Sequence, residues 1–283
     1  MCGARAMMGP QISRLSGDRL HFHHGPIDLI LWAEGAQTAQ AYAQAIARFE
    51  HVLEELVADL GDLRDPAPRV FNGAIALAMV AAVAPFRPEF ITPMAAVAGA
   101  VSDAVLAAMC RGTALTRAYA NNGGDIAVHL GPGQSLTAAM VGAGSTQLTL
   151  HHDQPARGIA TSGRTGRSLS RGIADSVTVV ARSAAMADAA ATMIANAVDL
   201  PGHPAITRSP ACSLKADSDL GEIMVTTGLG PLTQAEVAEA LENGYAAASG
   251  FANRGLIAGA ALFLHSKSRT LGTLSLAKDI EYV

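Results

Sequence analysis

The sequence predicts an α+β fold in which packed helices cover a largely antiparallel sheet. Strand-like runs come in pairs separated by tight turns, and helices with clear N-cap signals are interspersed among these pairs. Half of the 283 residues are apolar, which is enough to build a sizeable core. Tight turns join antiparallel strands locally, whereas parallel strands need long crossovers, so the pairs favour an antiparallel sheet.

The first half of the chain predicts two hairpins and two helices. Residues 20–32 form two strand-like runs around Gly25 and Pro26, which predicts a hairpin. Residues 38–60 carry apolar side chains at steps of three and four, which predicts one long helix. Thr92 followed by a proline is typical of a helix start, and that helix should run to Cys110. Residues 115–130 then predict a strand, a turn and a second strand.

The second half continues the pattern. A hairpin is predicted over residues 136–151, with its turn near residues 142–144. Two helices have N-cap signals: Ser183 begins one that runs to Ala197, and Thr233 with Glu236 forms a capping box for one that runs to Ala248. β-branched and apolar runs predict single strands over residues 175–181, 222–227 and 256–264.

Composition excludes several classes of protein. A net charge of −4 argues against a broad nucleic-acid surface. Three cysteines without a CxxC pair argue against a disulfide framework. No uninterrupted apolar run reaches the roughly 20 residues that span a bilayer, so we expect no membrane segment. We therefore expect a single domain over residues 1–283, located in the cytoplasm.

Residues Asn121 to Asp125 (NNGGD) lie between two predicted strands. Gly123 and Gly124 allow positive φ and a close approach of the backbone to a ligand, which Asp125 could orient. The same residues are also those that an ordinary tight hairpin requires. Both interpretations remain open from the pattern alone.

Residues 158–167 (GIATSGRTGR) combine glycines, hydroxyls and two arginines. Successive backbone N–H groups in such a turn can form an anion-binding nest, and Arg164 and Arg167 add donors that match a phosphate. Arg157 and Arg171 extend the positive charge. The alternative is a solvated loop.

Asp188 and Thr192 are four residues apart on the alanine-rich helix and therefore share one face. Carboxylate and hydroxyl oxygens suit Mg²⁺, which recruits waters or phosphates for its other positions. The alternative is the polar side of an amphipathic helix, with Met193 and Ile194 on the buried side.

In order, these segments resemble the ApbE superfamily, whose fold is α+β and related to the T-fold. The resemblance covers about residues 91–197. Its best-known members bind FAD and Mg²⁺ and move FMN onto a threonine of a target protein. The match is sharpest at Ala187-Asp188 and Thr192, similar to an Ala-Asp-x-x-x-Thr pattern that binds Mg²⁺.

The resemblance implies a set of site residues. Asp188 and Thr192 would bind Mg²⁺ together with a backbone carbonyl from the small-residue helix, that of Ala96 or Ala98. Residues that would bind FAD or FMN come from the NNGGD turn and from the Ser-Gly loop: Asn122, Gly123, Gly124, Asp125, Thr161, Ser162, Gly163, Arg164 and Arg167.

The departures leave the reaction open. The histidine and proline of the transferases are missing from residues 168–175, and so are the lysine of the small-residue helix and the export signal. The chain therefore looks similar to the superfamily's uncharacterised cytoplasmic branch. Asp125 and Asp175 are candidate bases if FMN is transferred to a protein acceptor. The alternative is a non-catalytic protein that binds a pterin or nucleotide. T-fold relatives commonly assemble through their sheets, so we expect a homo-oligomer.

Overall fold

A nine-stranded sheet organises the fold in the computed structural model, which describes residues 9–140 and 147–272. All neighbouring strands are antiparallel, which confirms the predicted α+β class. In spatial order the strands are β1 (Gln11–Arg14), β2 (Leu20–His24), β3 (Ile27–Gly35), β4 (Leu115–Asn122), β5 (Asp125–Leu130), β8 (Gly158–Ser162), β9 (Ser176–Ala181), β12 (Gly259–Leu264) and β13 (Lys267–Gly272).

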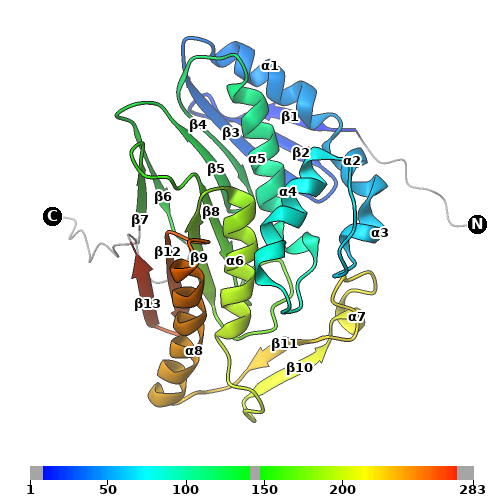
Figure 1. The fold of residues 1–283 in the computed structure, drawn as a ribbon, viewed down its shortest axis with the longest axis vertical. Helices are drawn as coiled ribbons and strands as arrows, with labels where there is room; N and C mark the ends of the chain where they lie inside the picture. Colours follow the sequence, from blue (N-terminus) through cyan, green and yellow to red (C-terminus); the bar gives the residue numbers. More distant parts are fainter. Residues whose placement is uncertain (1–8, 141–146, 273–283) are drawn as a thin grey trace, which may run out of the picture.

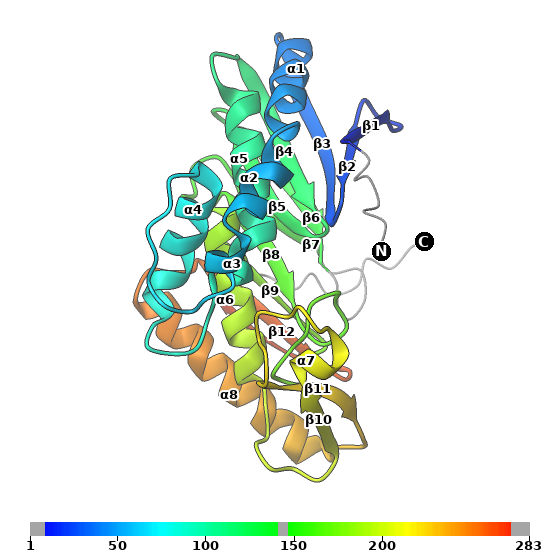
Figure 2. The same ribbon diagram turned by 90° about the vertical axis from the view of Figure 1, so that its right-hand side faces the viewer.

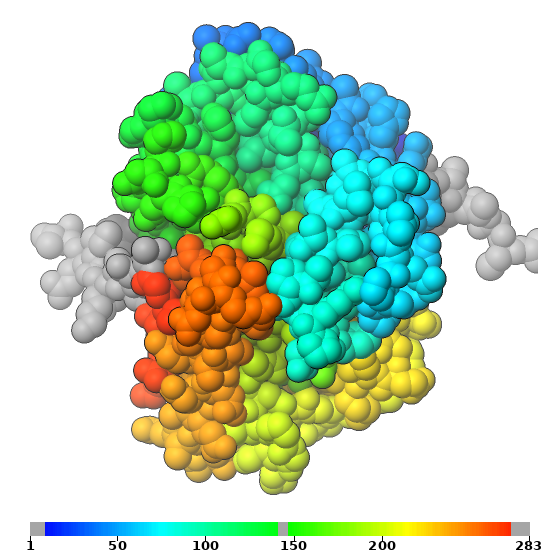
Figure 3. All heavy atoms as spheres, viewed as in Figure 1, coloured from blue at the N-terminus to red at the C-terminus, as the bar shows by residue number. Residues whose placement is uncertain are grey.

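The main helices cover one face of this sheet (Figures 1 and 2). In the space-filling view, α6 is largely hidden between α8 and the α4 region (Figure 3). The helices are α1 (Thr38–Phe49), α2 (Val52–Ala58), α3 (Leu60–Leu63), α4 (Ala74–Val83), α5 (Val97–Cys110), α6 (Ala184–Ala197), α7 (Ala211–Leu214) and α8 (Gln234–Asn253), with 3₁₀ turns η1 (Ala84–Phe86) and η2 (Pro93–Ala96).

A second, smaller core lies on the opposite face of the sheet. Side chains alternate between faces along a strand, so Val179 packs towards the helices while Val180 packs towards the other side. There the hairpin of β6 (Ser135–Ala139) and β7 (Gln147–His151) contributes Leu148 and Leu150. Both faces of the central strands are therefore buried.

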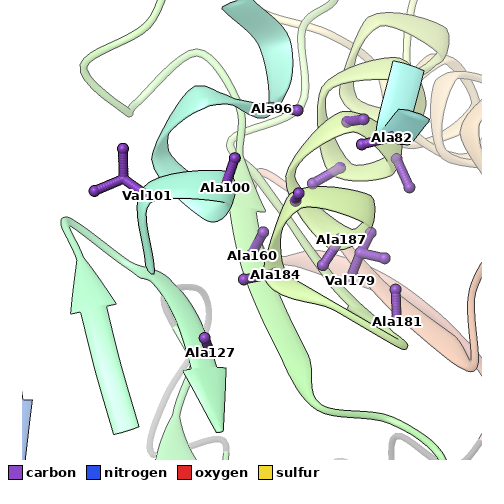
Figure 4. Close-up of a cluster of buried hydrophobic side chains, with 14 of the residues drawn as sticks. Ala82, Ala96, Ala100, Val101, Ala127, Ala160, Val179, Ala181, Ala184 and Ala187 are labelled. Atoms are coloured by element: carbon purple, nitrogen blue, oxygen red, sulfur yellow. The ribbon is translucent and has the colours of Figure 1, made fainter. Parts of the chain in front are cut away.

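Small residues let α5 and α6 lie close to the sheet and to each other. Ala100, Ala160 and Ala184 fill the junction of the two helices with the central strands (Figure 4). A Cβ on Gly158 of β8 would lie 2.0 Å from the carbonyl carbon of Ser183, so the strand and the start of α6 meet backbone to backbone. This is the close helix-on-sheet packing expected of an alanine- and glycine-rich chain.

One described helix is long and apolar enough to cross a membrane, namely η2 with α5 over Pro93–Cys110. More than half of its residues are buried inside the protein. The helix packs against β4, β5 and α6. Its apolar character is thus explained by its position in the core.

The prediction of one long helix over residues 38–60 was wrong. The segment breaks into α1, α2 and the start of α3, with interruptions at Glu50–His51 and at Asp59. Phe49, Leu53 and Leu56 are all buried, so the apolar spacing continues across the first break. No glycine or proline marks either interruption. The apolar period shows which side of the segment is buried and not whether its backbone hydrogen bonding is continuous, so it does not reveal the breaks.

The other predicted elements are confirmed, with shifts at their ends. The turn η2 precedes α5, and Thr92 donates its hydroxyl proton to Asp219 at 2.5 Å instead of capping the helix. The capping box at Thr233 is present, but α8 runs beyond the predicted end to Asn253. The predicted turn at residues 142–144 lies outside the described residues. The sequence did not reveal β1, β13 or the strand β10 (Ile206–Pro210), which pairs with β11 (Met224–Leu229) to form a small second sheet.

Candidate functional site

The start of α5 and the start of α6 meet over the helix side of the sheet. A Cβ on Gly99 of α5 would lie 2.3 Å from the carbonyl oxygen of Ala184, so only glycine permits this contact. Each helix supplies a carboxylate to the N-terminus of the other. Asp103 accepts hydrogen bonds from the N–H groups of Ala184 and Ala185 at 3.0 and 2.9 Å, and Asp188 accepts one from Gly99 at 3.0 Å. The N–H groups at the two helix starts favour the ionised form of each carboxyl, but burial outweighs them and raises the pKa of both Asp103 and Asp188.

Asp188 occupies the centre of this junction. Burial raises the pKa of its carboxyl well above the ordinary value, and the nearby charge of Asp125 raises it further. The N–H groups of Gly99 and Ala98 act in the opposite direction. The side chain keeps some exposed surface although protein atoms surround it densely.

Asp125 lies beside it, at the start of β5. Its cross-strand partner is Asn122, on the helix side of the sheet. Burial raises the pKa of Asp125 to about 7, against the opposing effects of the Thr161 N–H and of Arg167. The Thr161 N–H donates to its carboxylate at 3.2 Å, and the Ser102 hydroxyl donates to its carbonyl at 2.7 Å.

Asn122 fixes the backbone beside Asp125, its cross-strand partner. Its side chain is buried, donates to the carbonyl of Ala98 at 3.4 Å and accepts from the N–H of Asp28 at 3.3 Å. Ala98 lies in the first turn of α5, so its carbonyl oxygen also faces the helical N–H of Ser102, and a ligand would share this oxygen with both donors. Ala96, the other predicted carbonyl ligand, is the buried last residue of η2.

The side chain of Arg167 lies against the turn at Gly123 and Gly124. Both residues have positive φ, +65° and +117°. A Cβ on Gly123 would lie 2.1 Å from an Nη atom of Arg167, so the guanidinium rests directly on the turn. Arg167 is exposed and makes no hydrogen bond or ion pair with another described residue. Its charge acts on the neighbouring Asp125, whose pKa it lowers.

The predicted glycine-rich loop over residues 158–167 is shorter than expected. Its first five residues form strand β8. The hydroxyl of Thr161 pairs with that of Thr178 at 2.9 Å on the sheet face away from the helices. Only the N–H of Thr161 therefore contacts the candidate site, through its hydrogen bond to Asp125. Ser162 follows on the helix side by alternation. Gly163, at φ +144°, packs against the carbonyl of Asp175, where a Cβ would lie 2.6 Å from the oxygen.

Arg164 and Asp175 are engaged with each other. Their side chains form an ion pair at 2.5 Å, and the carboxylate of Asp175 also accepts the N–H of His265 at 2.5 Å. Because these contacts use both carboxylate oxygens, Asp175 is held in a structural arrangement, and the guanidinium of Arg164 is partly occupied. Of the two arginines predicted to bind a phosphate, Arg167 is the one left free.

Thr192 lies one turn after Asp188 and is half-buried, and its hydroxyl makes no hydrogen bond within the described part of the chain. Among residues 9–140 and 147–272, no three His, Cys, Asp or Glu side chains converge on a metal position. A metal here would therefore rely on one carboxylate, a hydroxyl and a carbonyl, which matches the way Mg²⁺ completes its shell with waters or phosphates.

Sequence reasoning missed the role of Asp103. In the sequence it is a single acidic residue within an otherwise apolar stretch. Its partners lie 81 and 82 residues further along the chain, so no local pattern reveals them.

The family of the chain follows from comparison with known proteins. Residues 12–272 match the protein family described as AbpE bacteria. The chain belongs to this ApbE-like family. The match includes every site residue described above.

Relatives of this ApbE-like chain occur in archaea under the name UPF0280 protein. The chain is 41% identical to that of Methanococcus vannielii over 115 residues, covering 38% of this chain and 45% of the relative. It is 32% identical to that of Methanopyrus kandleri over 190 residues, covering 60% and 69%. It is 34% identical to that of Methanocaldococcus jannaschii over 145 residues, covering 48% and 53%. The chain thus spans about half the length of most of these relatives, and their name specifies no activity.

Proposed function

We propose that this protein binds a flavin nucleotide, FAD or FMN, together with Mg²⁺ between the starts of α5 and α6 and the β4–β5 turn. One observation carries the proposal: two neighbouring carboxyls surrounded by protein, Asp125 and Asp188, lie beside Arg167, whose side chain makes no hydrogen bond or ion pair to a described residue. Acids inside and a cation at the edge suit a metal ion that bears a phosphate.

The carboxyls support a divalent cation. Two acids that both resist ionisation become ionised most readily when a positive charge lies between or beside them. Asp188 and Thr192 would hold Mg²⁺, with the carbonyl of Ala98 or Ala96 as a third ligand. The N–H of Gly99 orients the carboxylate of Asp188 for this purpose.

The turn supports a phosphate. Arg167 has its guanidinium donors free, and Gly123 and Gly124 leave no side chain between the backbone and a ligand. These features favour an oxyanion as part of the ligand. The flavin comes from the ApbE-like family resemblance, which is a weaker argument because related folds host different ligands.

Transfer of FMN from FAD to a threonine of a protein acceptor is the reaction that this site would support. The threonine oxygen would bond to the flavin-side phosphorus, the bond from that phosphorus to the bridging oxygen would break, and AMP would leave. Mg²⁺ would stabilise the negative charge on the phosphates. Asp125 has a pKa of about 7, near the value at which a general base works best at neutral pH. It would accept the proton of the attacking hydroxyl, a role that Asp175 is poorly placed to take while it is paired with Arg164.

A ligand screen tests the proposal. Thermal unfolding is measured with FAD, FMN, ATP and a pterin, each with and without Mg²⁺. We expect a Mg²⁺-dependent rise in melting temperature with FAD or FMN. A rise with the pterin alone would support the non-catalytic alternative, and no rise with any flavin would refute the proposal. Mass spectrometry of a threonine-containing acceptor incubated with FAD and Mg²⁺ then separates a transferase from a binding protein.

A further inference from the structure

Four arginines surround the strand and loop that run from β8 to β9, and their guanidinium groups differ in availability. Arg157 donates to the carbonyls of His152, Gln154 and Ala156, and Arg164 pairs with Asp175. Arg171, like Arg167, makes no side-chain hydrogen bond or ion pair to another described residue. Arg171 is half-buried, which is unusual for a cation without a partner.

The backbone of Arg171 is nevertheless held from two sides. Its N–H donates to Asn196 of α6 at 3.0 Å. Its carbonyl accepts from the guanidinium of Arg208 at 2.5 Å and from the hydroxyl of Thr226 at 3.4 Å, both on the β10–β11 sheet. The neighbouring carbonyl of Ser170 accepts the N–H of Thr226 at 2.8 Å.

The flanking residues bring this segment against α6. A Cβ on Gly172 would lie 2.1 Å from the carbonyl oxygen of Ala195, so the backbone touches the helix there. The N–H of Ile173 donates to the carbonyl of Val198 at 2.8 Å. The position of Arg171 is thus fixed while its guanidinium remains unused.

The face of α6 that binds the backbone of Arg171 also carries the candidate metal ligands. Asp188, Thr192 and Asn196 succeed one another at four-residue intervals and so share one face of α6. One turn rises about 5.4 Å, which is less than the length of an arginine side chain. From beside Asn196, the guanidinium of Arg171 can therefore reach a group that lies over Thr192, next to a metal held by Asp188.

The segment from β10 to β11 contacts the region of the candidate site at two places. Arg208 and Thr226 hold Arg171 at one place, while Asp219 accepts the hydroxyl of Thr92 just before η2 at the other. Figure 1 shows β10, β11 and α7 running along this side of the molecule from the end of α6 towards α3. Its contacts hold the backbone of Arg171 beside Asn196, near the end of α6.

We propose that Arg171 is a specificity-determining residue that binds the second phosphate of a metal-bound diphosphate ester, so that the site selects diphosphates over monophosphates. This inference rests on the proposed function for the metal and the first phosphate. Two cations from different segments match two phosphates, whereas a monophosphate needs only Arg167. Planar arginine donors bind an oxyanion in bidentate geometry, which lysine cannot reproduce.

The test compares two matched ligand pairs in Mg²⁺, namely FAD with FMN and ADP with AMP. Dissociation constants are measured for the wild type, Arg171→Ala, Arg171→Lys and the control Arg182→Ala, which removes an exposed arginine without a described partner. For Arg171→Ala we expect FAD and ADP to bind about tenfold more weakly or worse, with FMN and AMP changed less than about twofold. Arg171→Lys should fall between, and Arg182→Ala should match the wild type.

Equal weakening of diphosphates and monophosphates, or no weakening of either, would overturn the assignment of Arg171. Wild-type binding of ADP without binding of any flavin would refute the proposed flavin function, while the ADP and AMP pair would still decide the role of Arg171. If the wild type binds neither diphosphate in Mg²⁺, the assignment of Arg171 fails, whereas the proposed flavin function fails only if FMN does not bind either. Unchanged melting temperatures of the free variants show that the comparison reports on binding.

Discussion

The carboxylate of Asp188 on α6 accepts the backbone N–H of Gly99 on α5 at 3.0 Å. The bond joins two helices at the point where both begin. A local helix cap would come from the residue just before the helix, whereas this one comes from 89 positions along the chain. The candidate metal ligand is consequently also part of the helix junction.

Replacing Asp188 by asparagine separates these two roles. The amide oxygen can still accept the Gly99 N–H, and the like-charge interaction with Asp125 disappears. We expect the metal-free variant to be as stable as the wild type or more stable, and to lose the Mg²⁺-dependent thermal shift. The exposed Asp153→Asn is the matched control and should keep the shift. A destabilised variant that retains the shift would contradict the assignment.

Gly99 is predicted to be intolerant of a methyl group. In Gly99→Ala the new Cβ would meet the carbonyl of Ala184 at 2.3 Å, forcing the helices apart at a cost of about 1–3 kcal/mol in the free energy of unfolding. Gly61→Ala is the control, because Gly61 is also helical and has nothing within 4 Å of its added Cβ. That change should be neutral or stabilise by up to about 1 kcal/mol. Urea denaturation measures both, and equal effects would refute the close contact.

Asp103 should matter for folding rather than for ligand binding. Asp103→Ala leaves the N–H groups of Ala184 and Ala185 without their acceptor in a buried position. We expect a loss of about 2 kcal/mol or more in the free energy of unfolding. Ser183→Ala, which removes a 3.3 Å bond to Met186 at the same helix start, should cost about 1 kcal/mol. A smaller loss for Asp103→Ala than for Ser183→Ala would contradict the observed capping.

The elements that the sequence predicts well have signals within a few residues of each other. The capping box of Thr233 and Glu236 and the cap at Ser183 are examples, since side chain and backbone partner are three residues apart. The pairing of Asn122 with Asp125 follows equally from the short turn between them. Such contacts cost little loop entropy and leave a readable local pattern.

The parts that the sequence does not predict depend on distant contacts. The break at Glu50–His51 has no local marker, because the apolar period continues through it. The sequence also does not show which loop arginine lacks an ion pair, since Arg164 and Arg167 are of the same residue type and have similar neighbours. Only the three-dimensional arrangement brings Asp175 to one and the Gly123 turn to the other.

Stability should depend on pH through Asp125. Its pKa is about 7 in the folded protein, above the value of about 3.9 for an unfolded aspartate. The folded state therefore holds a proton that the unfolded state has lost, and the free energy of unfolding falls as pH rises from about 4 to about 7. For one proton the slope is at most about 1.4 kcal/mol per pH unit.

Urea denaturation of the metal-free protein across this range, compared with Asp125→Asn, measures that contribution. The variant should show a flatter dependence, whereas Asp153→Asn should follow the wild type. Mg²⁺ binding favours the ionised carboxylates, so the stabilisation by Mg²⁺ should grow as pH rises. An identical slope in Asp125→Asn and the wild type would show that the carboxyl titrates normally.

Truncation of Arg164 should lower stability, whereas truncation of Arg167 should weaken ligand binding. Arg164→Ala breaks the pair with Asp175 and leaves that half-buried carboxylate with the His265 N–H alone, so we expect a loss of up to about 1 kcal/mol in the free energy of unfolding. Arg167→Ala removes a cation without a described partner, so stability should stay within about 0.5 kcal/mol.

Because Arg167 lowers the pKa of Asp125, its removal should also shift the pH dependence of stability to higher pH. In Mg²⁺, Arg167→Ala should weaken binding of FMN and FAD about tenfold, since both place a phosphate at the turn. A larger binding loss in Arg164→Ala than in Arg167→Ala would reverse the assignment, because it would mean that the ion pair with Asp175 opens to receive the ligand.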